Sequence, residues 1–120
     1  MLPPEVLAAC ADEVEIEIVT MRADGAPRRT VVWPVVEGGT AYVRSYRGPH
    51  GRWYQEALVT PDAAIAVGGR DVPVRLVLAT DPASIAACSA ALARKYADDA
   101  SLPAMLVDEV LPTTLRIEPR

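Results

Sequence analysis

The sequence is poor in the residues that most often hold metals or act as nucleophiles. Its 120 residues include one histidine and two cysteines, Cys10 and Cys88. No CxxC pair and no Cys/His spacing typical of zinc occurs, so we predict no metal site and interpret both cysteines as buried small hydrophobic residues. There is no GxSxG element, which together with the single histidine argues against a serine hydrolase.

Other absences limit the location and the class of cofactor. No apolar run approaches the roughly 18 residues of a membrane-spanning helix, and no basic region opens the N-terminus. We therefore expect a cytoplasmic protein with no membrane partner. The glycine-rich stretches lack the GK[ST] ending of a P-loop, and none opens a helix after a buried strand as in a Rossmann domain.

Positive charge is scarce overall but locally concentrated. The net charge is -4, and the twelve basic residues are eleven arginines and one lysine. An acidic chain lacks the broad basic face of a nucleic-acid binder, so we expect no nucleic-acid partner. Because arginine keeps its charge and presents a planar fork to phosphates and carboxylates, a local arginine cluster would indicate a small anionic ligand.

Such a cluster occupies residues 42–55. The stretch YVRSYRGPHGRWYQ contains three arginines, the only histidine, three of the four tyrosines and one of the two tryptophans. Glycines in such a loop allow tight turns whose N–H groups can bind an anion, and a helix N-terminus follows. A flat ring could lie against Trp53 or Trp33. The alternative is a surface loop whose arginines pair with Glu15 and Glu17.

Hydrophobic periodicity predicts an α+β fold. Short connections favour antiparallel pairing, and many antiparallel strands in a short chain usually curl into a small barrel. We predict a single domain over residues 1–120, an antiparallel barrel of about six strands with flanking helices. We expect strands over residues 14–20, 28–36, 40–46, 63–67, 72–80 and 113–119, and helices over residues 3–13, 52–60, 82–98 and 101–110.

Two details of the strands bear on a site. Pro34 inside the second strand predicts an edge position or a bulge. In the third strand, alternation puts Tyr42, Arg44 and Tyr46 on one face and small residues on the other. The small residues suit the core, so Arg44 is expected to point out of the barrel, onto a face that becomes a groove wall if two subunits associate.

The run DGAPRRTVVWPVVEGGTAYVRSYRGPHGRWYQEALVTPDAAIAV, followed by VPVRLVLATD, resembles the split β-barrel flavin and deazaflavin oxidoreductases of the pyridoxamine phosphate oxidase superfamily. The form RGPHGRWY, with the closing TTLRIEP, is most similar to the small family of domain of unknown function 2255. The resemblance implies a homodimer that binds FMN or a deazaflavin coenzyme in grooves between two subunits. The substrate-binding arginine and histidine of pyridoxamine phosphate oxidases have no counterpart, which argues against vitamin-precursor oxidation.

The resemblance also implies which side chains hold the cofactor. In the superfamily, basic and hydroxyl side chains of the paired strands and of the loop after them hold the cofactor phosphate or tail. Together with the ring and glycine positions noted above, the candidate cofactor-binding residues are Arg29, Thr30, Trp33, Arg44, Ser45, Arg47, Gly48, Gly51, Arg52 and Trp53. No catalytic residue is assigned, but Tyr46, His50 and Tyr54 are candidate proton donors near a bound ring.

We interpret the chain as a flavin- or deazaflavin-binding protein that acts as an oxidoreductase by hydride transfer on a small organic substrate. Two alternatives use the same groove. One is a non-redox protein that binds a small anionic or aromatic ligand. The other is a cofactor-free enzyme with His50 or a tyrosine as general acid or base. Haem ligation by His50 has little support, because one histidine without a paired motif is poor evidence.

Overall fold

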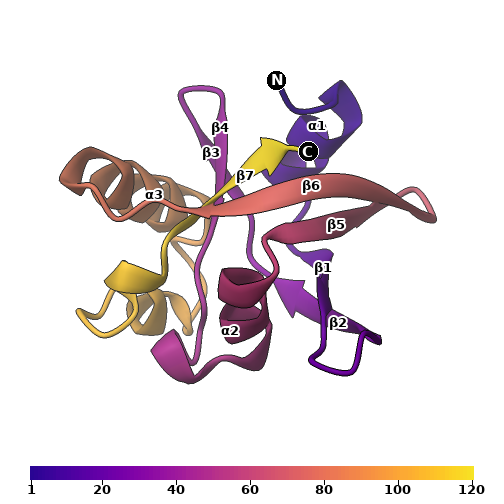
Figure 1. Cartoon of the computed structure of the whole chain (residues 1–120). Coiled ribbons are helices and arrows are strands. Elements are labelled where there is room, and N and C mark those ends of the chain that lie inside the picture. The colour runs from indigo at the N-terminus through magenta and orange to yellow at the C-terminus, as the bar shows by residue number, and fades with distance from the viewer.

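One curled antiparallel sheet organises the chain (Figure 1). In a computed structural model that describes all 120 residues, seven strands follow the order β2-β1-β5-β6-β7-β4-β3. The strands are β1 (Ile16–Met21), β2 (Pro27–Val32), β3 (Val35–Glu37), β4 (Thr40–Val43), β5 (Asp62–Val67), β6 (Arg70–Leu78) and β7 (Leu115–Pro119). The helices are α1 (Pro4–Asp12), α2 (Arg52–Val59) and α3 (Pro82–Lys95), with 3₁₀ turns η1 (Gly48–His50), η2 (Leu102–Met105) and η3 (Leu111–Thr113).

The predicted α+β split barrel is confirmed, with seven strands rather than about six because the predicted strand 28–36 breaks in two. β2 ends at Val32 and β3 begins at Val35, and these two strands form the opposite edges of the sheet. Pro34 lacks an N–H donor and restricts the residue before it, which explains a break at this point. Only two residues connect β2 to β3, so the end of β2 and the start of β3 lie within roughly 10 Å of each other although the strands are at opposite edges of the sheet.

The inner face of the curled sheet encloses the larger apolar cluster. Ile18, Ile65 and Val74 come from alternating strand positions and are completely buried. Val6 and Cys10 of α1 join them, as do residues of α2. The strict alternation of β1 and β6 therefore reflects one face on this core and one face toward solvent.

A second, smaller apolar cluster lies on the opposite face of β4. Cys88 and Leu92 of α3 pack there with Val35 and Tyr42. β4 is consequently buried on both faces. The apolar stripe of α3 is evident in the sequence, but the strand that it covers is not. As expected, Ala41 and Val43 face the barrel core and Tyr42 lies on the other side of β4. The expectation of an open face there is wrong, because Tyr42 and Arg44 are both buried.

The helices differ from the prediction mainly near the C-terminus. The helix expected over residues 101–110 is replaced by the short turn η2 and bends, and η3 follows. Pro103 and Pro112 lie in these turns, and proline limits the hydrogen bonding that a longer helix needs. None of the helices has the length and hydrophobicity that crossing a membrane requires.

Candidate ligand-binding site

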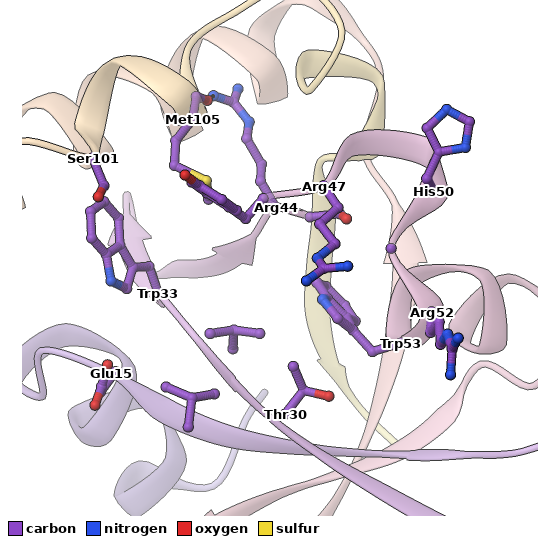
Figure 2. A pocket seen from close by; sticks show the side chains of 15 residues that line it. Glu15, Thr30, Trp33, Arg44, Arg47, His50, Arg52, Trp53, Ser101 and Met105 are labelled. Atoms are coloured by element: carbon purple, nitrogen blue, oxygen red, sulfur yellow. Dashed lines mark hydrogen bonds between the residues drawn. The ribbon is translucent and has the colours of Figure 1, made fainter.

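A cavity of about 590 Å³ lies beside the break between β2 and β3. Its wall combines the end of β2, the loop that leads into α2, and the region of η2, three segments far apart in the sequence. This volume falls within the range of small-molecule sites. The lining residues are Glu15, Thr30, Val31, Val32, Trp33, Arg44, Ser45, Tyr46, Arg47, His50, Gly51, Arg52, Trp53, Ser101 and Met105 (Figure 2).

Two tryptophan rings flank the cavity (Figure 2). Trp33 stacks on Tyr96 of the α3 C-terminus, with ring centroids 4.0 Å apart and an interplanar angle of 7°. The Tyr96 hydroxyl shares its one proton between the carbonyl oxygens of Val14, at 2.6 Å, and Pro34, at 3.2 Å, so the support of Trp33 is itself fixed. Trp53 is held on the opposite side in edge contact with a neighbouring tyrosine. The cavity thus has rigid aromatic walls.

The cavity contains arginines that no acid neutralises. Ion pairs with carboxylates are formed by Arg28, Arg29, Arg70, Arg75, Arg94, Arg116 and Arg120. Arg47 and Arg52 form none, although both side chains are exposed at the cavity. Glu15 is the only acid among the lining residues, so the cavity is locally positive in a chain of net charge -4. Such a lining favours an anionic ligand.

Ser45 presents a buried hydroxyl beside a helix N-terminus. Its Oγ has no hydrogen-bond partner, although the residue is completely buried. Gly51, the N-cap residue of α2, fits against it, because a Cβ at Gly51 would lie 2.2 Å from Ser45 Oγ. No side chain caps this helix, so the N–H groups of its first turn have no partner there. An anionic oxygen would find donors here.

Arg44 lies beside the cavity but is held inside the protein. It is 1% exposed, and its Nε donates to Thr114 Oγ1 at 2.8 Å. Its two Nη atoms donate to the carbonyl oxygens of Met105, at 3.1 Å, and Ile85, at 2.9 Å. Burial lowers the pKa of the guanidinium. The predicted position on an open groove wall is wrong, since α3 and η2 cover this face, and Figure 2 shows the side chain directed toward Met105.

Eight of the ten predicted cofactor-binding residues line the cavity, and two do not. Arg29 lies on the exposed side of the sheet, where it bonds to Glu17 at 2.8 Å and to Asp71 at 2.5 Å. Gly48 has a φ of 65° and packs against Glu109, whose Cγ would lie 3.3 Å from an added Cβ. Binding by the other eight stays a prediction.

The three candidate proton donors separate into two groups. Tyr46 and His50 are exposed and line the cavity. Tyr54 belongs to the interior apolar cluster instead, and burial raises the pKa of its hydroxyl. Five further lining residues were not predicted as site residues: Glu15, Val31, Val32, Ser101 and Met105. Only the tertiary fold brings Glu15, Ser101 and Met105 here, whereas the two valines lie between the predicted Thr30 and Trp33. No group of three or more His, Cys, Asp or Glu side chains is arranged to hold a metal ion.

Residues 6–117 match the family described as "Uncharacterized protein conserved in bacteria (DUF2255)". No curated protein matches the sequence significantly. The match covers nearly the whole sheet and every lining residue of the cavity.

Several solved structures are similar in fold. An F420-H2 dependent reductase superposes with a TM-score of 0.66 at 17% identity, over 90% of this chain and 96% of that chain. A candidate pyridoxamine 5′-phosphate oxidase from Listeria innocua gives 0.68 at 14% identity, over 96% and 90%. HutZ, the heme storage protein from Vibrio cholerae, gives 0.64 at 13% identity, over 99% and 90%. At such identities the similarity establishes the split β-barrel fold alone.

Proposed function

Because the chain belongs to the DUF2255 family of uncharacterized bacterial proteins, we propose its function from its own cavity: it binds FMN or a deazaflavin coenzyme and acts as an oxidoreductase on a small organic substrate. The observation that carries this proposal is the pair of arginines without acid partners, Arg47 and Arg52, beside Trp53. A flat ligand with a negative charge satisfies both the cations and the ring.

The anionic part of the cofactor would lie at the start of α2. Arg47 and Arg52 would donate to phosphate oxygens through their planar forks, and the first N–H groups of α2 point to the same region. Ser45 Oγ is the only buried side-chain polar atom without a partner, and a phosphate would give it one. The fit is therefore good at the level of donor chemistry.

The ring of the cofactor would lie against Trp53, the aromatic wall nearest Arg47 and Arg52. Trp33 and Trp53 provide flat apolar surface on two sides of the cavity (Figure 2). When bound, a flavin or deazaflavin ring supplies hydride chemistry, the exchange of two electrons and one proton with an organic substrate. The protein would orient the ring and exclude water. Tyr46 or His50, which line the cavity, would supply or accept the remaining proton.

Two proteins of similar fold support this proposal, since one is an F420-H2 dependent reductase and the other a candidate pyridoxamine 5′-phosphate oxidase. We also propose a homodimer that covers the cavity. Val31 and Tyr46 are 56% and 61% exposed at its rim, and a second copy would shield both. Light scattering after size-exclusion chromatography would test the dimer, and a monomer at micromolar concentration would overturn it.

Cofactor titration tests the main proposal. FMN and F420 are added separately to the purified protein, and tryptophan emission and the cofactor absorbance spectrum are followed. We expect one of them to bind and to quench emission. Arg47→Ala and Arg52→Ala should each weaken binding by about 1.5–3 kcal/mol, the value of a hydrogen bond to a charged group.

Arg22→Ala is the matched control, because Arg22 also forms no ion pair but does not line the cavity. If neither cofactor binds, or if the Arg22 variant weakens binding as much as the other two, the proposal is wrong. Binding without transfer of isotope-labelled hydride to any substrate would instead support the non-redox alternative, a protein that only binds a small anionic or aromatic ligand.

A further inference from the structure

The end of the cavity remote from Arg47 and Arg52 carries the opposite charge. Figure 2 shows Glu15 and Ser101 on the side of Trp33, and Arg47 and Arg52 on the side of Trp53. The Glu15 carboxylate forms no ion pair. The backbone N–H of Ser101 donates to Asp99 Oδ1 and its carbonyl oxygen accepts from the Ala104 N–H, but its hydroxyl forms no hydrogen bond within the protein and is free to accept. The cavity is therefore polar at both ends, with different signs.

One side chain, Tyr96, contacts both Trp33 and the backbone next to Glu15. The Tyr96 ring stacks on Trp33, and the Tyr96 hydroxyl bonds to the carbonyl oxygen of Val14, the residue before Glu15. The negative charge of Glu15 helps to raise the pKa of Tyr96, after the larger effect of burial, which is consistent with their proximity. The indole and the carboxylate are thus presented to the cavity together.

No cation of the protein neutralises this end. Lys95, the only lysine of the chain, lies behind the Tyr96 ring, with Nζ 5.4 Å from the ring centroid. Its ammonium donates to the carbonyl oxygens of Cys10, at 2.9 Å, and Pro34, at 2.7 Å, and it does not line the cavity. The negative carboxylate and the electron-rich face of an indole therefore remain for a ligand.

We propose that the end of the cavity formed by Glu15, Trp33 and Ser101 binds a cationic nitrogen group of a small-molecule substrate. The cation would lie over the indole ring, which attracts positive charge through its quadrupole, and would pair with the carboxylate. A protonated amine would also donate to the Ser101 hydroxyl. This proposal rests on the proposed function, because only an enzyme has a substrate. It narrows the substrate class to amines and cationic nitrogen heterocycles and excludes carboxylic acids.

The test uses the protein without cofactor. Phenethylammonium is titrated in parallel with its neutral analogue 2-phenylethanol, and the indole N–H resonances of the two tryptophans are followed by NMR, with Trp33→Phe used for assignment. We expect a saturable shift of the Trp33 resonance, and tighter binding of the cation than of the alcohol. Glu15→Gln should reduce the affinity for the cation by roughly threefold to tenfold and leave the alcohol unaffected.

Glu13→Gln is the matched control. Glu13 carries the same charge, lies two positions before Glu15 in the sequence, and is exposed outside the cavity. Equal binding of cation and alcohol, an equal effect of the two glutamine variants, or an unchanged Trp33 resonance would each overturn the subsite. The outcomes stay distinct from those of the cofactor titration. If the cation binds but neither FMN nor F420 does, only the proposed function is wrong. If a cofactor binds but the cation is not preferred over the alcohol, only the proposed subsite is wrong.

Discussion

On the exposed side of the sheet, Arg29 lies between Glu17 and Asp71, whereas Arg47 and Arg52 lie at the cavity without any carboxylate partner. The same residue type therefore occurs in two electrostatic environments. A paired arginine has its charge cancelled locally, so it presents little field to a ligand. An unpaired arginine gains nothing from the fold and keeps its full attraction for an anion.

Arg44 belongs to neither group. It is completely buried like a core residue, yet only neutral oxygens of Thr114, Met105 and Ile85 accept its hydrogen bonds. The difference among these arginines shows that partners, rather than residue type, separate a structural role from a binding role. Substitution should therefore affect stability at Arg44 and ligand binding at the cavity rim.

The largest effect is expected from Arg44→Ala. The change leaves a void in a packed region and removes the donor to the Met105 carbonyl oxygen, which we expect to lower the free energy of unfolding by about 3–4 kcal/mol. Urea denaturation would measure it. Arg75→Ala is the control, because Arg75 forms only an exposed pair with Asp62, which is worth about 0–1 kcal/mol. Similar losses in the two variants would contradict a structural role for Arg44.

A smaller effect is expected at the junction of the loop and α2. Gly51→Ala would place a methyl group 2.2 Å from Ser45 Oγ, so we expect a loss of about 1–3 kcal/mol from overpacking. The double variant Ser45→Ala/Gly51→Ala should recover most of this loss, because the next atom, Ser45 Cβ, lies 3.4 Å away. Chemical denaturation of the single and double variants checks the rescue. Without rescue, the clash is not the cause.

The fold was largely predictable from local pattern. Alternation in β1 and β6 and the apolar stripe of α3 follow directly from the sequence, and the short connections indicate antiparallel pairing. Pro34 predicts an edge position or a bulge, and the two strands beside it, β2 and β3, are both edge strands. The sequence does not indicate that the chain breaks there or that the two strands form opposite edges of the sheet. The order of strands in a sheet depends on contacts between residues far apart in the sequence. Local patterns of hydrophobic and polar residues therefore do not predict it.

The candidate site was predictable only in part, for the same reason. The loop over residues 44–53 is contiguous, so its cations and rings were visible as a cluster. The resemblance assigns Arg29 to the site together with Thr30, as the basic motif of the second strand, but strand alternation turns Arg29 toward Glu17. Glu15 and Ser101 reach the cavity from distant segments, and nothing near them in the sequence marks them as lining residues.

Ser45→Ala would sharpen the comparison between groups with and without partners. Removing a buried hydroxyl that has no partner should raise the free energy of unfolding by about 1 kcal/mol, while weakening the binding of a phosphate-bearing ligand. Thr20→Val is the matched control, because the Thr20 hydroxyl is buried but donates to Glu56 at 3.0 Å, so that variant should lose stability. Thermal unfolding with and without ligand measures both. If Ser45→Ala destabilises the protein without ligand, its hydroxyl has a partner in solution.

The smallest effect concerns acid pH and would test whether the surface pair differs from the cavity arginines. The hydrogen bonds from Arg29 hold the pKa of Asp71 below its ordinary value. A pKa lowered by folding contributes stability that is present above the unfolded value, near pH 4, and is lost as the pH falls through the folded value. Arg29→Ala should therefore make the unfolding midpoint less sensitive to pH between about 5 and 2, whereas Arg52→Ala, which removes a cation without an acid partner, should leave that sensitivity unchanged.

Both side chains of the surface pair are largely exposed, so solvent screening keeps the effect small. Equal pH profiles for the two variants would mean that the surface pair is not maintained in solution, and the contrast between paired and unpaired arginines would then disappear.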